Sequence, residues 1–367
     1  MKKNLLLILI PAITLLSFTS DKPAYLLYDK DGREVKYSKM LKDLEDADMI
    51  FFGELHTDPI AHWMQIELTK ALYSQKKEAL VLGAEMFEAD NQVILHEYLG
   101  GLYPADKFEA EMRLWNNYHT DYKPLVEFAK VHQIPFIATN IPRRYASMVY
   151  KGGFEALEAL SDEAKRFIAP LPILYDPEVK CYKDMLDMGT EKAPEGLKEI
   201  PEDMKAAPEG MMTDTAAMEA PAGMKTDTAA MEAPVGMKTD TTAMEAPVGM
   251  NTDTAAMKAP MGMPAAHGMS MEGMENLPKA QAAKDATMAH FILENWSAGK
   301  TFFHLNGSYH SNNHQGIIWY IQQQNRELRI VTINTVLQEE IGTLSEEYLN
   351  SADYIICVPE SMTRTGR

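Results

Sequence analysis

The sequence predicts an α/β fold, a mostly parallel sheet with helices covering both faces. The strand candidates are short, continuous apolar runs, as in strands buried on both faces, and segments with helical spacing separate them. Roughly 250 residues remain once a leader and a repeat array are set aside, and this size supports a single hydrophobic core.

Residues 1–20 have the pattern of a secretory signal peptide. Lys2 and Lys3 precede an apolar run from Leu5 to Leu16, and small polar residues follow up to Ser20. The run is too short to span a bilayer. We therefore expect export to the periplasm or cell envelope. No lipobox cysteine follows the run, so a lipid anchor is not expected.

Six strands are expected, each at a run too short and too uniformly apolar for a surface helix. They are Met49–Phe52, Ala79–Leu82, Pro135–Thr139, Thr301–Leu305, Leu328–Ile333 and Tyr354–Val358. Apolar residues at helical spacing predict the intervening helices. These are Ala61–Ser74, Asn91–Leu99, Asp121–His132, Arg143–Val149, Ala282–Ser297 and Gln315–Gln323.

The α/β domain is therefore expected in two parts, 21–189 and 282–367. Its stretch of about 150–189 shows helical sequence without a strand candidate, which predicts an inserted helical subdomain. Residues 190–281 are a low-complexity, Met-rich insertion that contains a 13-residue repeat beginning at Gly210. Its units hold Pro and Gly and no aromatic residue, so we expect this insertion to be disordered.

Two strand candidates lead into the same Gly-x-x-His pattern, at Gly53–His56 and at Gly307–His310. A glycine at a strand end permits a sharp turn, and ligands collect at the carboxyl edge of a parallel sheet. Glu54 and His56 follow the first strand, Glu85 follows the second, and His310 follows the late one. These four side chains are expected to converge, either as ligands of a divalent transition metal or as a general base beside a histidine.

The plainer alternative is that Glu54 and Glu85 cap helices while the histidines satisfy local hydrogen bonds. Other polar residues are expected near the same edge. His62 faces either the same cleft or solvent, Asn140 and Arg143 follow a strand, and His314 follows the last motif. Arg143 and Arg144 have the chemistry to hold an anionic group such as a propionate.

Composition limits the partners. The net charge of -18 argues against nucleic acid, whose phosphates need lysine and arginine. Cys181 and Cys357 could form one disulfide in an oxidising compartment or remain two unpaired thiols. The methionines and His267 of the repeat are soft donors that could hold Cu(I), although Met is also a generic flexible apolar residue.

An ordered set of motifs resembles the ChaN-like family of haem-binding uptake proteins, related to the Tiki, TraB and erythromycin-esterase groups. The set is Phe52–His56 with Asp58, His62 and Gln65, then Gly83–Phe87, Thr139–Arg143 and Asn306–His310. The resemblance covers most of residues 45–180 and 282–360. It implies an α/β core with a helical subdomain, an envelope location, and haem at the mouth of the site, sometimes between the two subunits of a homodimer.

The resemblance also implies residue roles. In related enzymes the residues matching Glu54, His56, Glu85 and His310 bind metal or activate water. A tyrosine contacts haem in the family, and Tyr145 and Tyr309 lie near the corresponding segments. The favoured hypothesis is a haem-binding protein that works with envelope uptake components. A metal-dependent hydrolase is the alternative, and copper binding through the Met-rich repeat is a third hypothesis.

Overall fold

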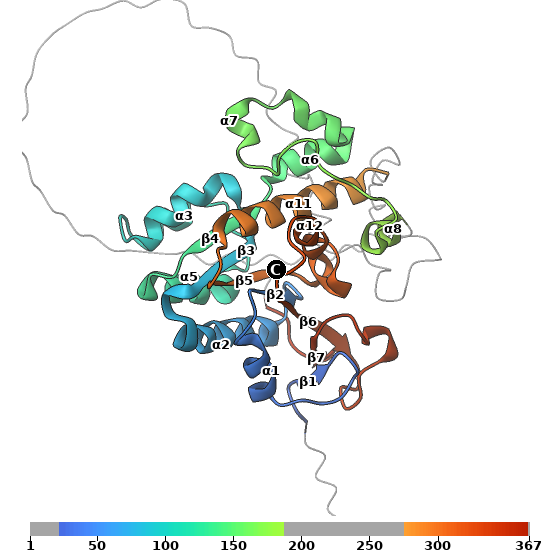
Figure 1. Ribbon diagram of the computed structural model, residues 1–367. Helices are drawn as coiled ribbons and strands as arrows, with labels where there is room; N and C mark the ends of the chain where they lie inside the picture. The colour runs from blue at the N-terminus through green and yellow to red at the C-terminus, as the bar shows by residue number, and fades with distance from the viewer. Residues whose placement is uncertain (1–21, 187–274, 366–367) are drawn as a thin grey trace, which may run out of the picture. The chain divides into compact units, whose positions relative to one another are not determined.

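A single sheet organises the protein. The computed structural model describes residues 22–186 and 275–365, and its seven strands lie in the order β1-β7-β6-β2-β5-β3-β4 (Figure 1). The strands are β1 Leu26–Asp29, β2 Met49–Glu54, β3 Leu80–Glu88, β4 Phe136–Asn140, β5 Thr301–Gly307, β6 Ile330–Gln338 and β7 Tyr354–Pro359. Neighbours are parallel except β1 against β7. The predicted α/β fold with a mostly parallel sheet is therefore confirmed.

Every strand expected from an apolar run is present, and all six continue beyond the run at the carboxyl end. Glu54 closes β2, and Glu85 lies inside β3 rather than after it. The register of β3 against β4 shifts between Ala84 and Glu88, which places Glu85 in the irregular part of the strand. The sequence did not indicate β1, because an edge strand of four residues has no long apolar run.

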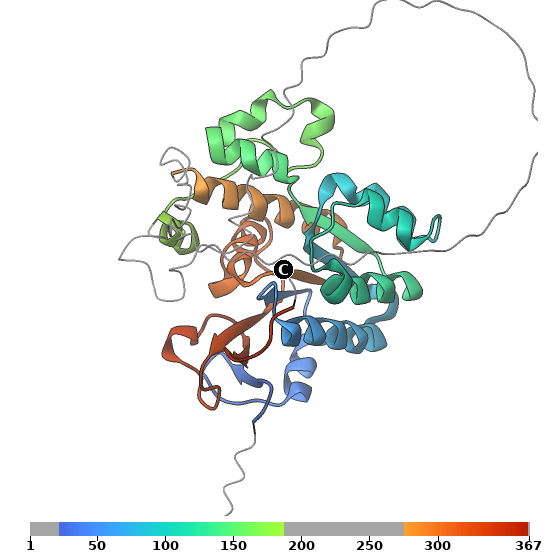
Figure 2. The same cartoon turned by 180° about the vertical axis from the view of Figure 1, so that it is seen from behind.

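Helices cover both faces of the sheet. They are α1 Tyr37–Leu44, α2 Pro59–Lys76, α3 Gln92–Leu99, α4 Ala105–Glu111, α5 Lys123–His132, α6 Arg143–Gly152, α7 Asp162–Lys165, α8 Lys180–Leu186, α11 Leu277–Asn295 and α12 Ile317–Gln324. Buried side chains of α1 to α5 share one apolar core with Ile50 and Phe52, whereas those of α6, α8, α11 and α12 share a second core with Met49 and Phe51. Figure 2 shows the two helix layers from behind. Alternate β2 side chains thus enter opposite cores, as a doubly covered strand requires.

The stretch after α6 consists of short helices. A 3-10 turn at Phe154–Ala159 precedes α7 and α8, and Leu157 and Tyr182 pack into the same core as α11. Helix α11 begins at Leu277, five residues before the expected domain boundary at 282, because Leu277 and Ala280 are already buried in that core. The signal peptide and most of the Met-rich insertion lie outside the described residues.

Cys181 and Cys357 are both free thiols. The structure therefore has two unpaired thiols and not the disulfide that was the other alternative. Cys357 is buried in β7 and Cys181 is half-buried at the start of α8. Within residues 22–186 and 275–365, no helix has the length and apolar composition needed to cross a membrane.

Candidate functional site

The two Gly-x-x-His motifs meet face to face at the carboxyl ends of β2 and β5. A Cβ added to Gly307 would lie 2.8 Å from Cε1 of His56, and one added to Gly53 would lie 2.8 Å from Cα of Ser308. Gly307 has φ −57°, an ordinary value. A sharp turn, which was expected at this strand end, is therefore not what requires a glycine at position 307. Both glycines are needed because each motif packs against the backbone or imidazole of the other.

Glu54 is a fully buried carboxylate with three donors around it. It accepts hydrogen bonds from the Tyr122 hydroxyl at 2.5 Å and the Gln65 amide at 2.5 Å, and its Oε1 lies 2.9 Å from Nδ1 of His56. Burial by itself would raise the pKa of Glu54. The charge of His62 and the hydrogen bonds from His56 and Tyr122 outweigh burial, so the pKa of Glu54 is lowered. Glu54 is therefore an ionised carboxylate that holds the His56 ring in place.

His56 is the histidine of this group that reaches solvent. Its side chain is 19% exposed, against 5% for His62. The Trp115 ring stands edge-on to the His56 ring at 4.9 Å between centroids. The His56 carbonyl accepts from the Asn117 amide at 2.7 Å and lies 3.0 Å from Nε2 of His62. The position of His56 is thus fixed by three sets of contacts: Glu54 at its ring nitrogen, Trp115 against its ring, and Asn117 and His62 at its carbonyl.

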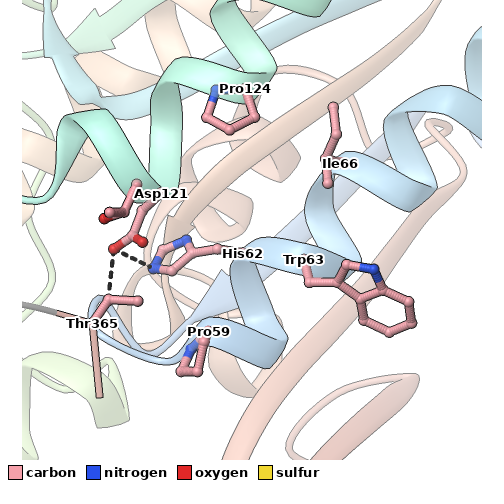
Figure 3. A pocket seen from close by; sticks show the side chains of 8 residues that line it. Pro59, His62, Trp63, Ile66, Asp121, Pro124 and Thr365 are labelled. Atoms are coloured by element: carbon pink, nitrogen blue, oxygen red, sulfur yellow. Dashed lines mark hydrogen bonds and ion pairs between the residues drawn. The ribbon is translucent and has the colours of Figure 1, made fainter. Parts of the chain in front are cut away.

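His62 is buried rather than solvent-exposed. Its Nε2 lies 3.3 Å from Oδ2 of the buried Asp121, at a pocket of about 220 Å³ (Figure 3). The Thr365 hydroxyl donates to the same carboxylate oxygen at 2.7 Å. Trp63 and Ile66 form an apolar wall. This volume is below the roughly 300–1,000 Å³ of pockets that enclose drug-sized ligands, so this pocket does not enclose a ligand of that size.

A second buried group consists of His310, Glu85 and Asp285. His310 Nε2 is 3.1 Å from Oε1 of Glu85, and His310 Nδ1 is 2.5 Å from Oδ1 of Asp285 on α11. Gly307 N donates to Oε2 of Glu85 at 2.8 Å, and the Tyr182 hydroxyl donates to Asp285 at 2.8 Å. Burial alone would lower the pKa of His310, but the two carboxylates raise it to about 10. His310 is therefore an imidazolium held between two carboxylates.

The four residues expected to converge do lie at one edge, where the His56 ring and the Glu85 carboxylate both approach Gly307. Glu54 holds His56, and Glu85 holds His310. In the part of the chain that the structure describes, no group of three or more His, Cys, Asp or Glu side chains is arranged to hold a metal ion. The expected divalent metal site is therefore not supported by this arrangement.

The remaining expected site residues are distributed around this edge. Arg143 pairs with Glu88, and Tyr145 is buried with the Arg144 guanidinium 4.3 Å above its ring. The Tyr309 hydroxyl donates to the Cys181 carbonyl at 3.1 Å, and burial raises the pKa of Tyr309. His314 contacts Asp353 at 3.3 Å, and both side chains lie beside Thr332 of β6. Asn140 closes β4, and its buried Oδ1 has no hydrogen-bond partner.

Sequence reasoning missed the partners that orient these groups. Asp285 lies within an alanine-rich helical segment, and Tyr122 and Asp121 lie in a π-helical turn at Tyr118–Tyr122. A signal for Asp285 existed, since a charged residue among the alanines of a buried helix needs a partner of opposite charge. The Tyr122 contact spans 68 residues of sequence and had no local signal.

The fold and site define an α/β protein with buried histidine and carboxylate pairs at the carboxyl edge of its sheet. The chain belongs to the family described as haem-binding uptake, Tiki superfamily, ChaN, whose model matches residues 40–321. The family resemblance drawn from the motifs is thereby confirmed.

A solved structure shares the fold. A structure of ChaN from Campylobacter jejuni, which shows cofacial haem binding, is 17% identical with a TM-score of 0.54, over 90% of this chain and 96% of that chain. A Bacillus cereus protein is 12% identical with a TM-score of 0.40, over 88% of this chain and 90% of that chain. No curated protein matches this chain.

Proposed function

We propose that this protein binds haem at the carboxyl edge of its sheet and serves haem or iron uptake in the cell envelope. Membership of the haem-binding uptake family supports the ligand. The signal-like residues 1–20 support export. Cofacial haem binding by the Campylobacter jejuni protein supports a site that takes haem at an open face.

The observation that carries the proposal is the partly exposed His56 on its buried carboxylate. Histidine is a common axial ligand of haem iron, and histidines that bind metals usually have their other ring nitrogen held by a carboxylate or carbonyl. Glu54 holds Nδ1 of His56, and Trp115 provides an aromatic edge beside the ring. When bound, haem would supply the iron centre that is carried. The chain's residues would hold and orient it.

Tyr309 and Tyr145, the two tyrosines expected near haem, are less suited than His56 to bind the iron. The Tyr309 hydroxyl is engaged by Cys181, and its raised pKa opposes the phenolate that iron prefers. Tyr145 is buried beneath Arg144. His56 is therefore the residue to change first.

We expect His56→Ala to weaken haemin binding at least tenfold, about 1.4 kcal/mol, while leaving the chain folded. Titration of the purified protein with haemin, followed by the Soret band, measures this. His290→Ala is the matched control, because His290 is half-buried near the end of α11 that leads to the amino end of β5. Haemin binding that is equal in both variants would exclude His56, and an unshifted Soret band in the unchanged protein would reject haem binding itself.

Two further parts of the proposal have separate tests. Cell fractionation with amino-terminal sequencing would locate the protein and its cleavage site; a cytoplasmic, uncleaved chain would contradict export. Sedimentation with and without haemin would test the homodimer. The metal-dependent hydrolase stays a prediction, since no group of three or more His, Cys, Asp or Glu among the described residues is arranged to hold a metal ion. The copper hypothesis rests on repeat residues outside the described residues.

A further inference from the structure

Strand β4 is the last strand of the sheet, and no strand among the described residues pairs with its outer side. Successive residues of a strand direct their backbone N–H and C=O groups to opposite sides. The Pro135 carbonyl accepts from Leu82 N of β3 at 2.9 Å, so Phe136 and Ala138 direct their backbone groups to the outer side. Unpaired groups of this kind form a template on which another chain can add a strand.

The side chain of Gln92 occupies this outer side. Its Nε2 donates to the Phe136 carbonyl at 3.1 Å, and its Oε1 accepts from Ala138 N at 2.6 Å. In a parallel sheet, one residue of a neighbouring strand makes the same two bonds, through its own N–H and C=O, to residues two positions apart. The Gln92 carboxamide therefore takes the place of one residue of a further parallel strand.

Helix α3, which begins at Gln92, lies over the same edge. Phe136 and Ala138 are only 2% and 1% exposed, although they belong to an outermost strand. The two hydrogen bonds of Gln92 are nevertheless only partly buried, and the adjacent Val93 is 67% exposed. Loss of the carboxamide would therefore free two backbone groups of β4 and also release the start of α3 from the edge.

The sequence of β4 suits it for pairing with another strand. The segment Phe136–Asn140 has no charged residue, and charge is one of the features that protect natural edge strands from pairing. Pro135 and Pro142 stand on either side and lack an N–H, so pairing is confined to the residues between them. A second copy offers the same edge, and two identical edges can pair antiparallel about a twofold axis. The partner that fits is therefore another molecule of this protein.

We propose that Gln92 is an edge cap, whose carboxamide keeps β4 from pairing with β4 of a second copy. The cap satisfies the outward backbone groups from within the chain, so the sheet ends at β4 without a charged residue there. This role is separate from haem binding and is tested without haemin.

Gln92→Ala is expected to expose the edge and to make the protein associate. Hydrogen exchange at Ala138 N should become about tenfold faster than in the unchanged protein, the scale of one lost hydrogen bond. Sedimentation velocity of the full chain should show a mass that rises with concentration, above that of the unchanged protein at the same concentration. Thermal unfolding would check that the variant is folded. If it is not, Gln92→Asn, whose carboxamide is one methylene shorter, replaces it with the same expected results.

Two further variants separate exposure of the edge from general loss of stability. In Gln92→Lys the side chain cannot accept from Ala138 N, so exchange should also be faster, but a lysine at the edge opposes strand addition and the mass should stay unchanged. Gln338→Ala is the matched control. The Gln338 side chain bonds the Glu340 and Thr343 carbonyls at 2.9 Å and Ser345 N at 2.8 Å, in a loop after β6. This variant should lose stability without a change in mass.

Three results would overturn the proposal. Unchanged exchange at Ala138 N in Gln92→Ala would show that the carboxamide does not cap the edge. Faster exchange without a gain in mass would show that the uncapped edge does not recruit a second copy. Association of Gln92→Lys or Gln338→Ala as strong as that of Gln92→Ala would assign the association to lost stability and not to the edge of β4.

Discussion

His310→Ala is expected to destabilise the fold by about 3–5 kcal/mol, the cost of removing one partner from a buried ion pair. The change would leave Glu85 and Asp285 as two buried carboxylates with no cation between them. Both would have to take up protons or admit water, at the cost of the packing around α11. Urea unfolding followed by circular dichroism would measure the loss.

The control for this prediction is a histidine in a similar pair near the surface. His314 contacts Asp353 at 3.3 Å, but the two side chains are 37% and 34% exposed. His314 also has φ +55°, so asparagine, which tolerates this conformation, is the appropriate replacement. His314→Asn should cost less than about 1 kcal/mol, as surface ion pairs do. Equal losses at the two positions would contradict the assignment of His310 as a buried cation.

The same group predicts how stability depends on pH. The pKa of His310 is raised to about 10 in the folded state, against roughly 6.5 in the unfolded chain. Its contribution is therefore complete below about pH 6.5 and is lost as the pH rises toward 10, at up to about 1.4 kcal/mol per pH unit. A His310→Gln variant should lack this decline in urea unfolding from pH 7 to 10. An unchanged slope would show that His310 does not carry the proton.

The sequence predicted the sheet well because its signal was local. Continuous apolar runs such as Met49–Phe52 mark strands buried on both faces, and the structure places their alternate residues in opposite cores. The expected strands ended early because Glu54, Glu85 and Asn306 are polar. These side chains remain in strands because Tyr122, Gly307 and Ser311 supply hydrogen bonds that the local sequence does not show.

The structure shows how the four candidate site residues are grouped, which their spacing in the sequence does not. Glu54, His56, Glu85 and His310 do gather at the carboxyl edge, as the parallel topology required. Their grouping depends on partners far away in sequence, above all Asp285, which contacts His310 from α11. With that carboxylate in place, His310 is paired as an internal cation. Spacing along the chain could not distinguish these two states.

Replacing the two motif glycines should separate the stability of the fold from the function of His56. In Gly53→Ala the new Cβ meets backbone, Ser308 Cα at 2.8 Å, so a strand must move and the fold should lose about 1–3 kcal/mol or more. In Gly307→Ala the new Cβ meets the His56 ring at 2.8 Å. That ring is the end of a side chain and can rotate away, so the stability loss should be smaller.

The rotation would nevertheless break the contact between His56 and Glu54, since Nδ1 cannot keep its 2.9 Å distance while the ring leaves Gly307. Gly307→Ala should therefore weaken haemin binding as strongly as His56→Ala does, while Gly53→Ala should show the larger shift in urea midpoint. Gly342→Ala is the control, because nothing lies within 4 Å of its added Cβ. If Gly307→Ala kept full haemin affinity, the position of the His56 ring over Gly307 would not be the one that binds haem, and the ligand would have to be sought outside the paired motifs.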